Sequence, residues 1–95
     1  MNTQTNIRNV VRKNQLQRIA NIVLILQSKP HTKTEIIGKL LLKFDQEFSK
    51  SQIEKDFFCL QMDFDAPIQY NKSQKNYQIE KDYDFKDALF QYVCI

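Results

Sequence analysis

Apolar residues recur at helical spacing in several segments of the chain, and the first clear segment runs from Gln15 to Gln27. Residues three and four apart lie on one face of a helix, so the pattern predicts a buried helix with a structural role. Proline disfavours helical geometry at the residue before it, and Pro30 therefore ends this helix. Its apolar face consists of Leu16, Ile19, Ile22, Val23, Ile25 and Leu26.

A second helix is predicted to begin at Thr32. Thr32 and Glu35 stand three residues apart, which is the signature of a capping box at a helix N-terminus. Gly38, inside this helix, costs about 1 kcal/mol relative to alanine, so we expect close helix packing there. The predicted apolar stripe is Ile37, Leu40, Leu41 and Phe44.

Residues 49–64 predict a third helix. Ser49 and Gln52 form a second capping box, and Phe48 before the cap can serve as a hydrophobic staple. The connection 45–48 lacks the glycine often found in the turn of a helix-turn-helix, so we expect a looser or longer turn.

The third helix has two contrasting faces. Its apolar stripe predicts the buried side, and Ser51 and Lys55 lie roughly opposite that stripe. Gln52 and Cys59 lie on its flank. The stripe itself consists of Ile53, Phe57, Leu60 and Phe64.

A β-hairpin follows this helix. Ile68 and Tyr70 alternate with glutamine in one short run, as do Tyr77 and Ile79 in the next, which predicts two strands. The loop 71–76 between them is polar, carries two lysines, and contains asparagines, which tolerate positive φ. It is either an ordinary hairpin tip or a wing that contacts phosphate.

The segment 83–95 predicts a fourth helix, capped by Asp84, with an apolar face. Phe58 and Met62 form a second apolar pair, off the main stripe of the third helix. Exposed apolar patches mark interfaces, so we expect these two surfaces to meet, within one chain or across a homodimer. The expected interface consists of Phe58, Met62, Phe85, Leu89, Phe90, Tyr92 and Val93.

Residues 1–14 show only weak helical spacing among polar residues. They are interpreted as an N-terminal arm, an extension of the first helix or a segment ordered by a partner, with a disordered terminus as the alternative. Arg8, Arg12 and Lys13 could contact phosphate, as basic arms often do.

Composition and charge narrow the class of protein. The 95 residues are 42% hydrophobic and 26% charged, which fits one small globular domain. We expect a cytoplasmic protein without a membrane span, because the apolar runs are short. Residues 1–50 carry a net charge of +6 and residues 51–95 a net charge of −3, so one face is suited to a polyanion.

The chain offers little for catalysis. It contains two cysteines and one histidine, and has no glycine-rich phosphate loop or nucleophile elbow. Asp56, Asp63 and Asp65 are interpreted as helix-surface charges rather than as a metal cluster, and both cysteines as reduced thiols. We therefore expect no enzyme activity, no metal and no cofactor.

Two segments, 48–57 and 66–77, resemble the N-terminal winged helix-turn-helix domain of the WYL-domain (DeoR-like) bacterial transcriptional regulators. That family's pattern runs Ser-x-Arg-Thr-Ile-x-Arg-Asp-Leu, then a Pro-Ile-x-Tyr strand, then a basic turn ending in Gly-Tyr. The chain departs from it at Ser51, Gln52 and Lys55, where Arg, Thr and Arg are usual, and at Asn76, which replaces the turn glycine. The family's Arg-Asp pair implies that Asp56 pairs with a nearby lysine.

The resemblance implies a mainly α fold with a small β-hairpin: a three-helix core, a two-strand wing and an extra C-terminal helix. The winged helix-turn-helix domain then spans residues 15–82, and 83–95 form the C-terminal helix and possible dimerisation element. It further implies sequence-specific binding of double-stranded DNA by a transcriptional regulator, for example a repressor. Regulators of this family carry an effector domain after this one, so an effector domain beyond the chain end is possible.

In this interpretation the helix 49–64 enters the major groove and the wing 71–76 lies on the DNA backbone. Gln52 makes a bidentate contact with adenine, and Lys55 or Lys50 reaches guanine or a phosphate. The expected DNA contacts are Thr32, Lys33, Thr34, Lys50, Ser51, Gln52, Lys55, Lys72, Ser73 and Lys75.

A second interpretation assigns the winged helix to protein–protein interaction without specific DNA reading. The neutral Ser51 and Gln52, the acidic C-terminal half and the apolar Phe58, Met62 and Phe90 favour it. Salt dependence of binding to a duplex distinguishes the two interpretations.

Overall fold

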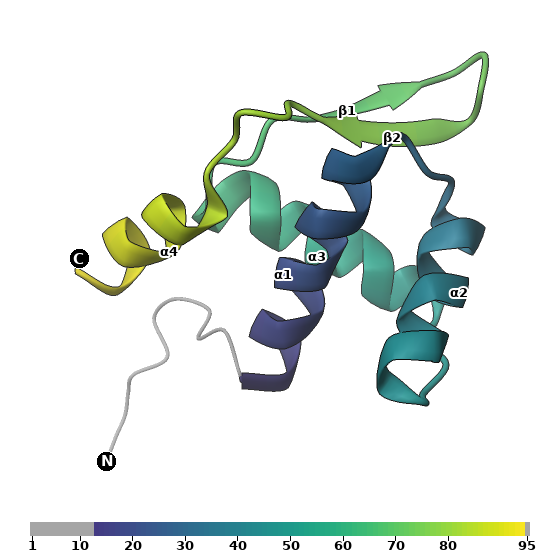
Figure 1. Cartoon of the computed structure of the whole chain (residues 1–95), viewed down its shortest axis with the longest axis horizontal. Helices are drawn as coiled ribbons and strands as arrows, with labels where there is room; N and C mark the ends of the chain where they lie inside the picture. Colours follow the sequence, from purple (N-terminus) through teal and green to yellow (C-terminus); the bar gives the residue numbers. More distant parts are fainter. Residues whose placement is uncertain (1–12, 95) are drawn as a thin grey trace.

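The computed structural model of the protein describes residues 13–94, and Figure 1 shows the arrangement of its elements. The described part is mainly helical with a two-stranded antiparallel hairpin, which confirms this part of the prediction. The arrangement is compatible with a winged helix. The expected N-terminal arm lies outside the described residues except for its last two, of which Lys13 begins the first helix. The elements are α1 (Lys13–Ser28), α2 (Lys33–Phe44), α3 (Lys50–Asp63), β1 (Ile68–Asn71), β2 (Asn76–Ile79) and α4 (Phe85–Val93).

The hydrophobic core lies where α1, α2 and α3 meet, and β2 covers one end of it. On α2, Ile36 and Leu40 are buried in the core and Ile37 and Phe44 pack against it, whereas Leu41 is 41% exposed. Three of the four predicted stripe residues therefore face the core. The prediction wrongly included Leu41 and omitted Ile36, because α2 carries many neighbouring apolar residues. The expected close packing at Gly38 was also wrong, since a Cβ added there would meet nothing within 4 Å.

Both predicted capping boxes are present. Thr32 Oγ1 accepts a hydrogen bond from the Glu35 amide at 3.1 Å, and the Thr32 amide donates to Glu35 Oε1 at 2.9 Å. Ser49 forms the same pair of contacts at the start of α3. These caps satisfy backbone donors that a helix N-terminus leaves without partners, and so fix where each helix begins.

The turn between α2 and α3 covers residues 45–49 and begins with a left-handed residue. Asp45 takes the left-handed conformation (φ 54°, ψ 39°) that glycine usually supplies, and its amide donates to the Leu41 carbonyl at 2.8 Å. Phe48, the predicted staple, is buried and packs edge-to-face on Phe44 at 6.2 Å between ring centroids.

The hairpin is short and joined to the helical core. Tyr70 pairs with Tyr77 and Asn71 with Asn76, so the loop spans only residues 72–75 and the positive φ falls on Lys75 rather than on an asparagine. In the link between α1 and α2, His31 forms an antiparallel bridge to Tyr77, with N–O distances of 3.0 and 2.8 Å. The hairpin is thus hydrogen-bonded to the link that precedes α2.

Helix α4 lies at the C-terminal end of α3, on the side away from α2 (Figure 1). Asp84 caps it, as predicted, by accepting from the Asp87 amide at 3.1 Å. The Tyr83 hydroxyl donates to the Phe64 carbonyl, and Gln27 Nε2 of α1 donates to the Tyr83 carbonyl at 2.7 Å. These contacts hold the segment that leads into α4. No helix in the described range is long and apolar enough to cross a membrane.

Candidate nucleic-acid interface

A basic groove of about 370 Å³ lies between the N-terminal ends of α2 and α3 and the hairpin. It brings together residues that are far apart in the chain, and half of the expected DNA contacts line it. Those five are Thr32, Lys33, Thr34, Lys50 and Lys75, and the groove is completed by Tyr70 and Tyr77. The remaining five, Ser51, Gln52, Lys55, Lys72 and Ser73, are exposed on α3 or on the hairpin loop.

Helix α3 turns its polar side outward, as predicted. Ile53, Phe57 and Leu60 are buried in the core, and Lys55 and Gln52 are exposed. The buried stripe therefore sets which side chains face a partner, since residues three and four apart share one side of a helix.

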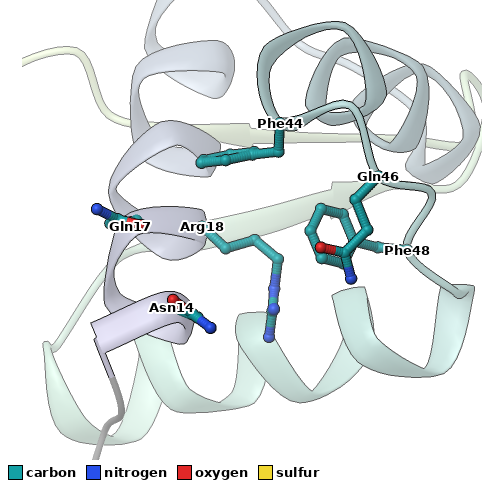
Figure 2. Close-up of a pocket in the computed structure, with 6 residues that line it drawn as sticks. All are labelled: Asn14, Gln17, Arg18, Phe44, Gln46 and Phe48. Atoms are coloured by element: carbon teal, nitrogen blue, oxygen red, sulfur yellow. The ribbon is translucent and has the colours of Figure 1, made fainter.

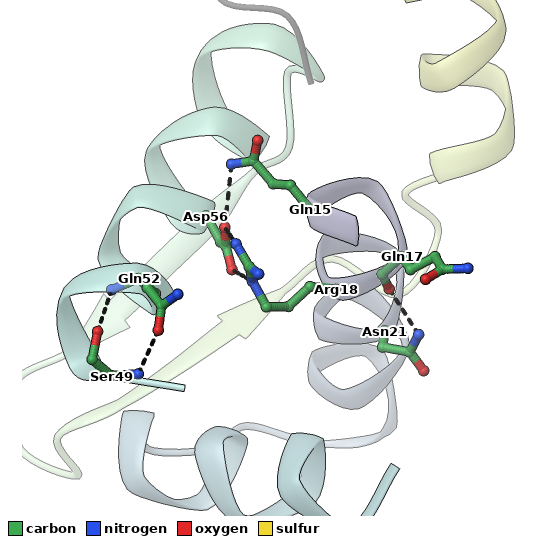
Figure 3. Close-up of polar contacts among 7 residues, drawn as sticks. All are labelled: Gln15, Gln17, Arg18, Asn21, Ser49, Gln52 and Asp56. Atoms are coloured by element: carbon green, nitrogen blue, oxygen red, sulfur yellow. Dashed lines mark hydrogen bonds and ion pairs between the residues drawn. The ribbon is translucent and has the colours of Figure 1, made fainter. Parts of the chain in front are cut away.

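The Gln52 side chain already has a structural role. Its Oε1 accepts from the Ser49 backbone amide at 2.9 Å, while the backbone amide of Gln52 donates to Ser49 Oγ at 3.1 Å (Figure 3). A bidentate contact with adenine uses both Oε1 and Nε2 of a glutamine. The expected adenine contact therefore competes with the capping box, which leaves Nε2 to act as a single donor.

Lys33 is paired within the groove. Its Nζ forms an ion pair with Glu54 Oε2 on α3 and lies 5.9 Å from the centroid of the Tyr77 ring. The hydrogen bond with Glu54 raises the pKa of Lys33 above its ordinary value, and the same contact lowers the pKa of Glu54. Lys33 is thus less available to a phosphate than Lys50 or Lys75, for which no ion pair is found in the described part of the chain.

The orientation of α3 depends on a buried ion pair that the sequence reading missed. Asp56, expected on the helix surface and paired with a lysine, is fully buried and pairs with Arg18 of α1. Arg18 donates to both carboxylate oxygens, with an Nη2–Oδ1 distance of 2.9 Å, and Gln15 Nε2 adds a contact of 3.3 Å (Figure 3). Asp56 follows Ile53 by three residues and precedes Leu60 by four, and this spacing places it on the buried stripe.

A pocket of about 220 Å³ lies beside this ion pair, between α1 and the connection that leads to α3 (Figure 2). The Arg18 guanidinium crosses it 4.9 Å from the centroid of the Phe48 ring. Because Asp56 already neutralises the Arg18 charge, we interpret the pocket as part of the packing between α1 and α3 rather than as a ligand site. It is lined by Asn14, Gln17, Arg18, Phe44, Gln46 and Phe48.

The expected dimer interface divides into two groups. Phe85, Leu89 and Tyr92 are partly buried against the protein's own core, with ring centroids of Phe85 and Tyr92 at 5.3 and 4.8 Å from Phe64. For these three the expectation needs correction, because the apolar face of α4 covers the end of α3. The other four, Phe58, Met62, Phe90 and Val93, are 60–67% exposed.

The two cysteines differ in environment. Cys59 is buried, with its thiol 3.5 Å from Asp63 Oδ2, and burial raises its pKa to about 12. Cys94 is exposed, and both are free thiols. Among residues 13–94, no group of three His, Cys, Asp or Glu side chains could hold a metal ion.

The sequence reading did not assign a binding role to Tyr70 or Tyr77, although both line the groove. Each had been explained by strand alternation alone. Their cross-strand pairing was the available signal, because it places both rings on the same side of the hairpin.

The chain was compared with protein-family models, with curated proteins and with solved structures, and none of the three comparisons found a match.

Proposed function

We propose that this protein is a winged helix-turn-helix DNA-binding protein that reads double-stranded DNA sequence-specifically, as a bacterial-type transcriptional regulator. The observation that supports it most strongly is the basic groove, because lysines and threonines from α2, α3 and the hairpin converge there. Lysines that converge on one surface bind the DNA backbone, and a positioned helix beside them can read base edges.

In this proposal the N-terminal half of α3 enters the major groove. Lys50 and Lys55 contact guanine or a phosphate, Ser51 adds a less selective contact, and Gln52 supplies one donor from Nε2. The ion pair between Arg18 and Asp56 supports this role, since it joins α3 to α1 and fixes the outward face.

The contacts with the DNA backbone come from both sides of α3. The hairpin serves as the wing, and its loop residues Lys72, Ser73 and Lys75 contact phosphates on one side. At the start of α2, the backbone amides of Lys33 and Thr34, which the capping box does not use, meet a phosphate on the other side, because helix N-termini favour anions. Each lysine that contacts a phosphate adds about 0.9 to the slope of log affinity against log salt.

A homodimer accords with this function, because two copies would read two half-sites of one operator. The exposed residues Phe58, Met62, Phe90 and Val93 are the proposed contacts between copies. If a Met62→Ser, Phe90→Ser double variant and the wild type had the same mass in sedimentation equilibrium, these residues would not form the interface.

The experiment that tests the main proposal begins with selection of duplexes from a random pool, followed by fluorescence anisotropy at two salt concentrations. We expect steep salt dependence, and we expect Lys55→Ala to weaken specific binding by about 1–3 kcal/mol. Lys86→Ala, which removes the same charge from an exposed position on α4, is the matched control. Equal binding by the wild type and Lys55→Ala would refute the assignment of α3 as the reading helix.

A second candidate function is protein–protein interaction. It is favoured by one observation: Phe58 and Met62 are exposed on the same outward face of α3 that carries Ser51 and Lys55. A face that is polar at one end and apolar at the other also fits a protein partner. Duplex binding that is absent at low salt would favour this candidate.

A further inference from the structure

Three aromatic rings in tilted contact form a row that runs from the hydrophobic core into the basic groove. Phe57 of α3 is buried, Tyr77 lies 4.5 Å from it between ring centroids, and Tyr70 lies 4.7 Å beyond Tyr77. Tyr70 is 49% exposed and forms the outer end of this row of rings. The innermost ring thus belongs to the core, while the outermost reaches solvent inside the groove.

The outer ring of Tyr70 packs on Tyr77, whose own position is fixed by several contacts. Tyr70 and Tyr77 are directly paired across the two strands, and the Tyr77 backbone is hydrogen-bonded in both directions to His31. Lys33 also lies over the Tyr77 ring. A ring held in this way loses little conformational freedom when a ligand packs on it.

The surroundings of Tyr70 decide which ligand chemistry fits. Lys50 comes from α3 and Lys75 from the hairpin, and both line the same groove as Tyr70, together with the threonines at the start of α2. Proteins bind unstacked nucleotides by placing bases on aromatic rings and phosphates against lysines. The groove volume of about 370 Å³ also falls within the range of small-ligand sites, about 300–1,000 Å³.

We infer that Tyr70 stacks on an unpaired nucleobase, so that the groove binds nucleic acid where one nucleotide has left the base stack. In an intact duplex both faces of each base are covered by its neighbours, and a ring gains access to a base face only when that base is extruded or single-stranded. This inference rests on the proposed DNA binding and adds to it a preference for one class of DNA.

The test compares two fluorescein-labelled DNA duplexes of the same sequence. One is fully paired, and the other carries a single unpaired 2-aminopurine nucleotide at its centre. We expect the wild type to bind the second duplex more tightly in anisotropy titrations and to quench its 2-aminopurine fluorescence by stacking.

Variants of the hairpin show whether the Tyr70 ring causes the preference for the duplex with the unpaired nucleotide. Tyr70→Ala should weaken binding to the duplex with the unpaired nucleotide roughly 5- to 150-fold, with much less effect on the paired duplex, while Tyr70→Phe keeps the preference. Gln69→Ala, at the exposed neighbouring position of β1, is the matched control. Circular dichroism melting confirms that each variant is folded before binding is compared.

The outcomes separate the two levels of the proposal. Equal binding of both duplexes by the wild type, or a preference that survives Tyr70→Ala, would overturn the role of Tyr70 and leave DNA binding in place. If neither duplex bound at low salt, the DNA-binding function itself would be refuted, and the stacking role with it.

Discussion

Arg18 on α1 and Asp56 on α3, which stand 38 residues apart in the chain, form a buried ion pair in which the guanidinium donates to both carboxylate oxygens. The Asp56 side chain is fully buried and that of Arg18 is 13% exposed. The buried carboxylate of Asp56 is tolerated only because Arg18 is present, since their attraction offsets the free-energy cost of removing the charge from water. The pair therefore fixes which side of α3 faces the core.

Removing one member of this pair should destabilise the protein strongly. We expect Asp56→Ala to lower the free energy of unfolding by about 3–5 kcal/mol, because it leaves the Arg18 charge without its partner. Urea denaturation followed by circular dichroism measures the loss. Asp82→Ala, at an exposed position, is the control. A double change to Arg18→Met and Asp56→Leu should recover much of the stability, whereas an effect of Asp56→Ala no larger than that of the control would contradict the prediction.

Glu54 should limit the charge that the groove presents to DNA. Because its carboxylate pairs with Lys33, Glu54→Gln frees a lysine, and we expect tighter duplex binding with a salt slope steeper by up to about one unit. Glu80→Gln removes the same charge at a distance from the groove and is the matched control. Equal effects from both changes would show that only the total charge matters.

The ion pair between Lys33 and Glu54 can also be tested without DNA. In Lys33→Met, the pKa of Glu54 should return towards its ordinary value of 4.5, because the contact that lowers it is gone. Carbon-13 NMR titration of the glutamate carboxyl groups measures the change. A Glu54 pKa that is the same in the variant and in the wild type would mean that the pair does not form in solution.

The two thiols should differ in reactivity. Burial raises the pKa of Cys59 to about 12, so its thiolate remains scarce up to pH 9, while Cys94 is exposed. We expect a thiol reagent such as Ellman's reagent to modify one cysteine rapidly in the folded protein and the second only after unfolding. Cys94→Ser should abolish the rapid phase, and two rapid thiols in the native protein would contradict the burial of Cys59.

Stability should fall at alkaline pH through Tyr83. Burial raises its pKa from an ordinary 10.0 to about 12 in the folded protein. As pH rises above 10, the unfolded chain loses this proton first, so the contribution is present below pH 10 and is lost between pH 10 and 12. We expect Tyr83→Phe to flatten the pH dependence of the unfolding free energy there, measured by urea denaturation. A Tyr83→Phe variant that kept the wild-type slope between pH 10 and 12 would contradict this prediction.

The parts of the fold that could be predicted depend on contacts close in sequence. Each capping box joins residues three apart, as in Thr32 with Glu35 and Ser49 with Gln52. The starts of α2 and α3 could therefore be predicted from the sequence. The burial and pairing of Asp56 could not be predicted in this way, because its partner Arg18 lies on another helix. On α2 the prediction included Leu41 in place of Ile36 for a local reason, since both belong to apolar sets at helical spacing.

The same distinction applies to the candidate site. Lysines and threonines at helix starts and in a hairpin loop are recognisable one by one, and Lys50 and Lys75 were predicted on that basis. The pairing of Lys33 with Glu54 is not recognisable in this way, because it arises only when α2 and α3 are brought together. The place of Tyr70 in the groove likewise depends on how the hairpin meets the starts of α2 and α3.

The bridge between His31 and Tyr77 joins the hairpin to the helical body by two backbone hydrogen bonds. Swinging the hairpin away from α2 requires both hydrogen bonds of the bridge to break, so the protein itself sets the span from Lys75 to the first turn of α2. Under the proposed function, a duplex must adjust its groove width to that span. Flexible base steps adjust at lower energetic cost than stiff tracts, and the protein would then discriminate between sequences at base pairs that no side chain reaches.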